Sequence, residues 1–244
     1  MWRTVIVKRY LIYGIAFILF LSLGVSACQA AGLTSTTPTV SQSNTSSLAF
    51  SSVSDVAHTP SWKQVDADGV LLGIGVPLGW SAHRAQAGLL LAERSAPIGE
   101  DSNTAGMELH IFVSRMEQFE GFTDSVENPA LHALRQVVGD NDLIGNVLAT
   151  EPRSFEWDSH PAAYYLLSDG RDSLGVVIGF ALEASERLVV LNLSAPKDQR
   201  EAIRGRLYEL LTGFTVNGDE LNPDALDAIP DSLAFPDIEA ANNT

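Results

Sequence analysis

The chain has 244 residues, with 30 Asp and Glu against 15 Lys and Arg, and a formal net charge of −15. Because recognition of phosphate backbones depends on clustered Lys and Arg, this composition argues against a nucleic-acid-binding function. A single cysteine, Cys28, excludes an internal disulfide and any cysteine-rich metal site.

The first 28 residues have the pattern of an export signal. Arg3, Lys8 and Arg9 precede an uncharged apolar run, Tyr10–Ala27, which ends in Val25-Ser26-Ala27-Cys28. A basic start, an apolar centre and small residues before a cleavage site are typical of secretory signals. The run approaches the roughly 20 residues needed to span a bilayer, so an uncleaved membrane anchor is the alternative. Either arrangement places the remaining chain outside the cytoplasm.

The motif Val25-Ser26-Ala27-Cys28 resembles the lipobox of bacterial lipoproteins. This resemblance implies cleavage between Ala27 and Cys28, diacylglycerol on the Cys28 sulfur, and attachment to a lipid bilayer of the cell envelope through the acyl chains. Loss of residues 1–27 would leave 12 Lys and Arg against the same 30 acids, a net charge of −18. A cationic partner, divalent cations or simple solubility are the alternative reasons for such a surface.

Composition divides the remaining chain into three parts. Residues 28–60 are predicted to be the lipidated cysteine and a disordered tether, because the stretch TSTTPTVSQSNTSS has too few apolar residues to fold. Residues 61–217 are predicted to form a single domain, which is long enough for a substantial core. Residues 218–244 are acidic, contain three prolines and no Lys or Arg, and are predicted to be a disordered tail with at most one short turn near Asp224–Ile229.

The first half of the domain is predicted to contain three strands and a helix. Val70–Val76 and Gly88–Glu93 are apolar runs, and Met107–Val113 alternates apolar and polar residues, which predicts one buried face. Asn128-Pro129 has the cap and first-turn residues of a helix that ends at Gly139. Its expected apolar face carries Leu131, Leu134 and Val138.

The second half is predicted to contain two hairpins, a helix and a last extended piece at 214–216. Arg153–Trp157 and Ala162–Leu167 flank a turn at Asp158-Ser159-His160-Pro161, and Leu174–Leu182 precedes Leu188–Leu193. A helix capped by Ser194 or Ala195 follows and ends at Gly213. Its expected apolar stripe is Ile203, Leu207, Leu210 and Leu211. The order β-β-β-α-β-β-β-β-α predicts an α+β fold, a mostly antiparallel sheet flanked by two or so helices.

Within residues 68–216 the chain resembles the PsbP-like group, which includes the photosystem II extrinsic P protein, the Ran-binding Mog protein and small bacterial lipoproteins. The resemblance is carried by the strand before Pro77-Leu78-Gly79-Trp80, the central helix, the turn before Pro161-Ala162-Ala163-Tyr164, two long strands and the last helix. It implies an α/β/α sandwich and a role in binding or assembly. The group has no shared catalytic residues to carry over.

No catalytic, metal or cofactor site is predicted. None of the five histidines pairs at i,i+4, and the calcium-like spacing from Asp140 to Glu151 has Ile144 at a position that needs an oxygen ligand. The aromatic residues Trp80, Trp157 and Tyr164 have two interpretations, a ligand groove or a part of the core.

These observations favour a membrane-anchored extracytoplasmic lipoprotein, monomeric and non-catalytic, that binds or scaffolds an unidentified protein partner. The alternative is a small-ligand or cation-binding module. A hydrolase with an unrecognised site is a third hypothesis.

Overall fold

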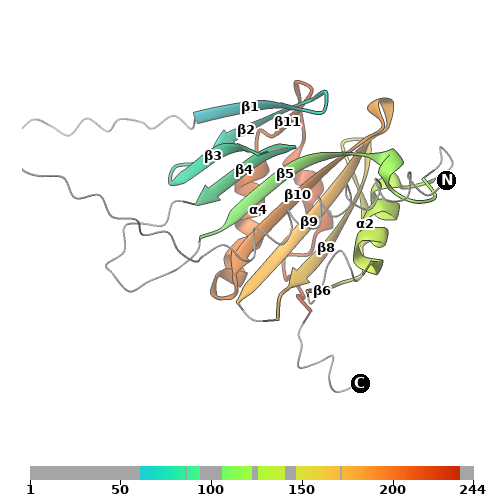
Figure 1. The fold of residues 1–244 in the computed structure, drawn as a ribbon. Helices are drawn as coiled ribbons and strands as arrows, with labels where there is room; N and C mark the ends of the chain where they lie inside the picture. Colours follow the sequence, from blue (N-terminus) through green and yellow to red (C-terminus); the bar gives the residue numbers. More distant parts are fainter. Residues whose placement is uncertain are drawn as a thin grey trace, which may run out of the picture.

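The computed structural model describes residues 61–85, 87–93, 106–122, 126–140, 147–170 and 172–236. In this part of the chain, a large twisted sheet has one long helix on each face, and a smaller sheet lies beside it (Figure 1). The predicted signal sequence, Cys28 and the tether lie outside these ranges. No helix within the described ranges has the length and apolar character needed to cross a membrane.

The large sheet is antiparallel at every pairing among the described residues. Its order is β3-β4-β5-β10-β9-β8-β6, and β7 also pairs with β8. The strands in this order are β3 (Trp80–Ala85), β4 (Gly88–Glu93), β5 (Glu108–Arg115), β10 (Arg187–Pro196), β9 (Ser173–Leu182), β8 (His160–Ser168), β6 (Leu148–Ala149) and β7 (Arg153–Trp157). With the helices below, this arrangement confirms the predicted α+β class.

The small sheet has the order β1-β2-β11-β12 and is also antiparallel. Its strands are β1 (Ser61–Ala67), β2 (Val70–Val76), β11 (Thr215–Val216) and β12 (Asp219–Glu220). The chain passes from β2 to the large sheet through the turn before Trp80, whose N–H donates to Pro77 O at 3.1 Å. Gly79 has φ +85°, a left-handed conformation that glycine adopts without strain.

Helix α2 (Pro129–Gly139) covers one face of the large sheet. It begins and ends as predicted, but its buried face differs from the expected Leu131, Leu134 and Val138. Ala130, Ala133, Leu134 and Val137 are buried, whereas Leu131 and Val138 are only partly covered. The small alanines let the helix approach the sheet closely, and Leu134 packs on Gly179 of β9, where an added Cβ would lie 3.4 Å from its side chain.

Helix α4 (Ile203–Leu211) covers the opposite face and buries the predicted stripe of Ile203, Leu207, Leu210 and Leu211. The predicted start at Ser194 or Ala195 is wrong. Those residues remain in β10, which pairs with β9 as far as Pro196, and a 3₁₀ segment, η3 (Lys197–Ala202), comes before α4. Pairing with the long strand β9 satisfies the backbone groups that a helix would otherwise use.

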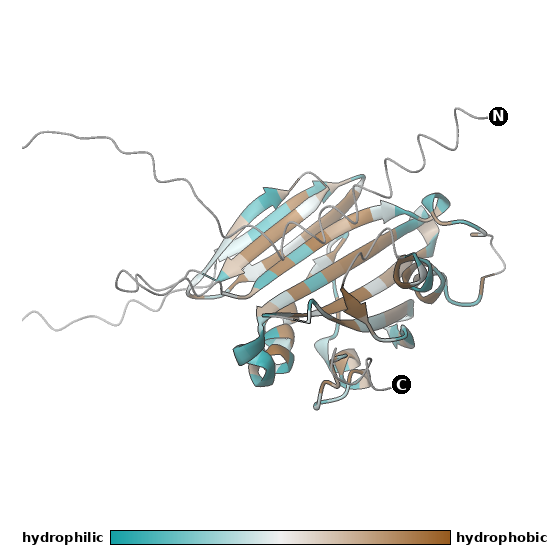
Figure 2. Cartoon of the chain, turned by 60° about the horizontal axis from the view of Figure 1, so that its bottom comes forward, coloured by the Kyte–Doolittle hydropathy of each residue, from teal (hydrophilic) through white to brown (hydrophobic). Residues whose placement is uncertain are grey.

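Strand β5 is buried on both faces near its end, whereas one buried face was expected. Leu109 and Ile111 are buried as predicted, on the α4 side, and Phe112 also packs in the cluster on the α2 side. The layer made by α2 and η1 (Met116–Gln118) produces this second burial. Hydrophobic residues accordingly lie along the central strands, and the outer faces of the helices carry hydrophilic residues (Figure 2).

The structure corrects the predicted disordered tail over residues 218–236. Leu221, Leu226, Ile229 and Leu233 are buried in the main core, and η4 (Pro223–Ala228) forms where only a short turn was expected. Arg204 of α4 donates to Leu226 O at 2.9 Å. Apolar residues recur every three to five positions between the acids, so this acidic segment still buries a hydrophobic side.

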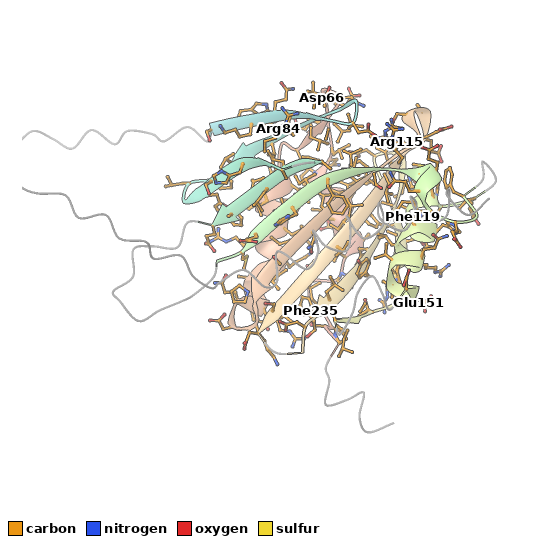
Figure 3. All side chains as sticks on the ribbon, viewed as in Figure 1. Asp66, Arg84, Arg115, Phe119, Glu151 and Phe235 are labelled. Atoms are coloured by element: carbon orange, nitrogen blue, oxygen red, sulfur yellow. The ribbon has the colours of Figure 1, made fainter. Side chains whose placement is uncertain are left out.

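An ion-pair cluster joins the two sheets. Asp68 lies in the β1–β2 turn, where it accepts hydrogen bonds from Arg115 Nε at 2.9 Å and Arg115 Nη2 at 3.1 Å, and it also pairs with Arg187 Nε at 3.0 Å. Figure 3 shows Arg115 at the end of the sheet near this turn. The hydrogen bonds from Arg115, together with the charges of both arginines, lower the pKa of Asp68 below its ordinary value of 3.8.

We expect Asp68→Asn to destabilise the domain at pH 6 by about 1 kcal/mol or less, because exposed ion pairs contribute little. The pKa of Asp68 is lower in the folded than in the unfolded protein. Its contribution to the free energy of unfolding is therefore fully present above the unfolded pKa and is lost as the pH falls through the folded pKa. Urea unfolding should therefore show the difference between wild type and variant shrinking from pH 6 to pH 3. The exposed Asp198→Asn is the control, and a difference that grows in acid would contradict this account.

Candidate functional site

A groove of about 730 Å³ opens between the beginning of α2 and the β7–β8 hairpin. Its walls combine apolar side chains with both acidic and basic ones. The lining residues are Val126, Glu127, Asn128, Leu131, His132, Arg135, Ser154, Phe155, Glu156, Ser159 and Pro161. Its volume lies within the range of roughly 300–1,000 Å³ that ligand-binding pockets occupy.

Asn128 forms hydrogen bonds with both walls of the groove. Its Oδ1 caps α2 by accepting from Leu131 N at 2.8 Å, and its Nδ2 donates to Ala162 O of β8 at 3.0 Å. Pro129 fits the first turn because its missing N–H would have no helical partner there. The predicted Asn-Pro cap therefore sets the position of α2 against the hairpin as well as the start of the helix.

The hairpin wall depends on a two-residue turn. Asp158 and Ser159 have φ values of +47° and +68°, which is the geometry of tight hairpin connections. Trp157 and His160 form the closing pair, and Glu156 lies opposite Pro161. β7 pairs with β8 on one side only in the described part of the chain. Its other side is a sheet edge on the groove.

The groove is acidic. Glu127 on the α2 side and Glu156 on β7 are both exposed, and neither makes an ion pair within the described ranges. The one arginine in the lining, Arg135, is paired with Glu151 at 3.3 Å. Glu151 lies beside α2 (Figure 3). The carboxylates therefore outnumber the cations around this opening.

His132 lines the same groove but is engaged by its surroundings. Its Nε2 lies 2.8 Å from Glu120 O and 3.0 Å from Gln136 Nε2. These contacts tie α2 to the segment that follows η1. They make the imidazole part of the contact between α2 and Glu120.

The structure places Trp80, Trp157 and Tyr164 in the main core, at 4%, 0% and 4% exposure. Trp157 packs edge-on against Phe180, with ring centroids 5.4 Å apart, and donates from Nε1 to Asn222 O at 2.9 Å. Tyr164 borders a crevice of about 60 Å³ under residues 230–234. These placements favour the core interpretation of the three aromatic residues. Cys28 and Ala27 lie outside the described residues.

The remaining candidate ligands are dispersed. His160 is half-buried beside Phe180, and the Asp158 carboxylate accepts from Asn222 N. Part of the calcium-like stretch, residues 141–146, lies outside the described residues. Where the chain is described, no three His, Cys, Asp or Glu side chains come close enough to hold a metal ion.

On the α2 side of the sheet, three buried polar atoms lack hydrogen-bond partners among the described residues. No sequence pattern indicated them. They are His110 Nε2, Asn192 Oδ1 and Tyr165 Oη. His110 and Asn192 face each other across β5 and β10, and His110 Nε2 is 3.6 Å from a Glu108 carboxylate oxygen. Burial raises the pKa of the Tyr165 hydroxyl far above its ordinary value. Only the strand pairing brings His110 and Asn192 together.

No protein-family model matches this chain. No curated protein sequence matches it either. Among solved structures, cyanobacterial PsbP (CyanoP) from Synechocystis sp. PCC 6803 aligns with a TM-score of 0.43 and 14% identity over 68% of this chain and 98% of that one. The Ran-binding protein Mog1p of Saccharomyces cerevisiae aligns with a TM-score of 0.36 and 14% identity over 61% of this chain and 84% of that one. Both belong to the group that the sequence resembles, and membership of this chain in that group stays a prediction.

Proposed function

We propose that this protein is a membrane-anchored extracytoplasmic lipoprotein that binds a partner protein without catalysing a reaction. The observation that carries the binding role is the groove between α2 and β7, where an unpaired sheet edge lies beside apolar and acidic side chains. The signal pattern and the motif ending in Cys28 support the anchor and the location.

The groove chemistry favours binding over catalysis. A hydrolase needs a nucleophile within hydrogen-bond reach of a base. Ser154 and Ser159 line the groove, but the nearby imidazole nitrogen of His132 contacts Glu120 O and Gln136. The groove instead offers backbone groups, hydrocarbon surface and carboxylates, which together suit recognition of another chain.

A photo-cross-linking amino acid in place of Ser154 tests the binding role in native membranes. We expect a discrete adduct of this chain with one partner protein after irradiation. The same replacement at Glu201, an exposed residue of η3, is the matched control and should give no such adduct. Mass spectrometry of the native protein tests the anchor, and it should show a chain that begins at Cys28 and carries acyl groups there, because roughly 0.8 kcal/mol per buried methylene would hold it at the bilayer.

Each half of this proposal fails on a different result. Native protein whose intact mass still includes residues 1–27, or whose Cys28 carries no acyl group, would contradict the lipid anchor. Equal cross-linking from Ser154 and Glu201 to abundant neighbours would contradict a binding groove. Turnover of a substrate by the purified protein that is lost on groove substitution would contradict the non-catalytic assignment.

A further inference from the structure

We infer that the groove takes an extended, lysine- or arginine-bearing segment of a partner protein, which pairs with β7 as an added strand. The inference rests on the proposed binding function and specifies the chemistry of the partner. It combines three features of the described residues: the unpaired edge of β7, the apolar surface beside it and the uncompensated carboxylates.

The register of the hairpin shows which backbone groups face the groove. Glu156 lies opposite Pro161, and proline has no N–H to donate. In an antiparallel ladder, hydrogen-bonded and non-hydrogen-bonded pairs alternate, and the closing pair Trp157–His160 is hydrogen-bonded. Glu156, and Ser154 two residues earlier, therefore direct their N–H and C=O groups away from β8. These groups form the ladder that an added strand would complete.

The side chains around the edge provide a place for apolar residues of the added strand. Leu131 of α2 and Phe155 of β7 are partly covered, and both line the groove. Alternate side chains of a strand point to the same face. One set of partner side chains would therefore face α2 and Leu131, and the other set would lie near Phe155.

Charge selects a basic occupant. Glu127 and Glu156 lie on opposite walls of the groove, and Arg135 is already paired with Glu151. The whole chain has a net charge of −15, which steers cations toward it and repels a second copy. Residues 29–60 and 218–244 contain no Lys or Arg, so neither terminal segment of this chain supplies the cations. A basic segment of another protein fits the charge of the groove.

Three fluorescent, end-blocked heptapeptides test the inference against the full-length protein in detergent. The first is Lys-Val-Lys-Val-Lys-Val-Lys, the second has Glu in place of each Lys, and the third is the lysine peptide with alternate backbone amides N-methylated. Fluorescence anisotropy should show the lysine peptide binding at least 10-fold more tightly than either of the others. Its affinity should fall as salt is raised, because exposed charges are screened beyond about 8 Å at physiological ionic strength.

Two variants locate the binding. Glu156→Lys reverses a groove charge and should lower the affinity for the lysine peptide at least 5-fold. The matched control Glu201→Lys should leave that affinity unchanged. Ser154→Pro removes one backbone N–H that points away from β8 and keeps the hydrogen bonds between β7 and β8. It should therefore lower the affinity for the lysine peptide by a similar factor. Thermal unfolding checks that each variant is folded, and the N-methylated peptide tests the ladder without changing the protein.

The results separate this inference from the proposed function. Equal affinity for the lysine and glutamate peptides would overturn the basic occupant. Equal affinity for the N-methylated peptide, or an unchanged affinity of folded Glu156→Lys, would overturn strand addition at β7. If the Ser154 cross-linker still captures one partner in membranes, either result leaves the binding function standing. Loss of that adduct would remove the function itself.

Discussion

Removal of residues 218–244 is expected to lower the free energy of unfolding by more than about 5 kcal/mol, because burial of each aliphatic side chain contributes roughly 1.5–3 kcal/mol. The truncation removes Leu221, Leu226, Ile229 and Leu233, all of them buried in the main core. It also removes the carbonyls that Arg200 and Arg204 bind at 2.9 Å. Domains have total stabilities of about 5–15 kcal/mol, so the truncated chain should be largely unfolded at 37 °C.

Urea unfolding followed by tryptophan fluorescence measures this effect. A truncation after residue 236 is the control, since it keeps every contact just named. Leu226→Ala tests the same packing without shortening the chain and should cost about 2–5 kcal/mol, as for other fully buried leucines. Wild-type stability in both the truncated chain and Leu226→Ala would restore the interpretation of this segment as a disordered tail.

Trp157→Ala is expected to destabilise the domain by about 3–5 kcal/mol, because it removes a large, fully buried ring. The indole contacts Phe180, and its Nε1 donates to Asn222 O, so it joins β7, the sheet core and the C-terminal segment. Trp157→Phe keeps part of the ring surface but leaves that carbonyl without its donor. It should cost about 1–3 kcal/mol.

This series also separates the two interpretations of the aromatic residues. If Trp157 is a core residue, Trp157→Phe should bind the lysine heptapeptide as wild type does while unfolding at lower urea. If Trp157 lines a ligand groove, Trp157→Ala should keep near-wild-type stability and lose binding. Unfolding midpoints and peptide anisotropy, measured on the same preparations, decide between them.

Several elements could be predicted because local chemistry determines them. The alternation of apolar and polar residues indicated β5, a long apolar run indicated β9, and Asn128 followed by Pro129 marked the start of α2. β1 and β3 were missed. In β1 the first four residues are exposed, so no alternation marks it as a strand, and the element exists through its pairing with β2. β3 likewise shows little burial beyond Trp80.

The sequence alone determined the α+β class, the acidic charge, the second apolar helix stripe and the presence of a turn after Trp157, because each depends on neighbouring residues or on the total composition. The turn is shorter than the predicted Asp158-Ser159-His160-Pro161, because His160 and Pro161 pair within the hairpin as part of β8. The attachment through Cys28 stays a prediction of the same kind. Only the tertiary structure decided that residues 218–236 belong to the core, that Trp80, Trp157 and Tyr164 are buried, and that Glu127 and Glu156 share one groove. These results depend on which distant segments pack together, and packing of that kind leaves no periodic signal along the chain.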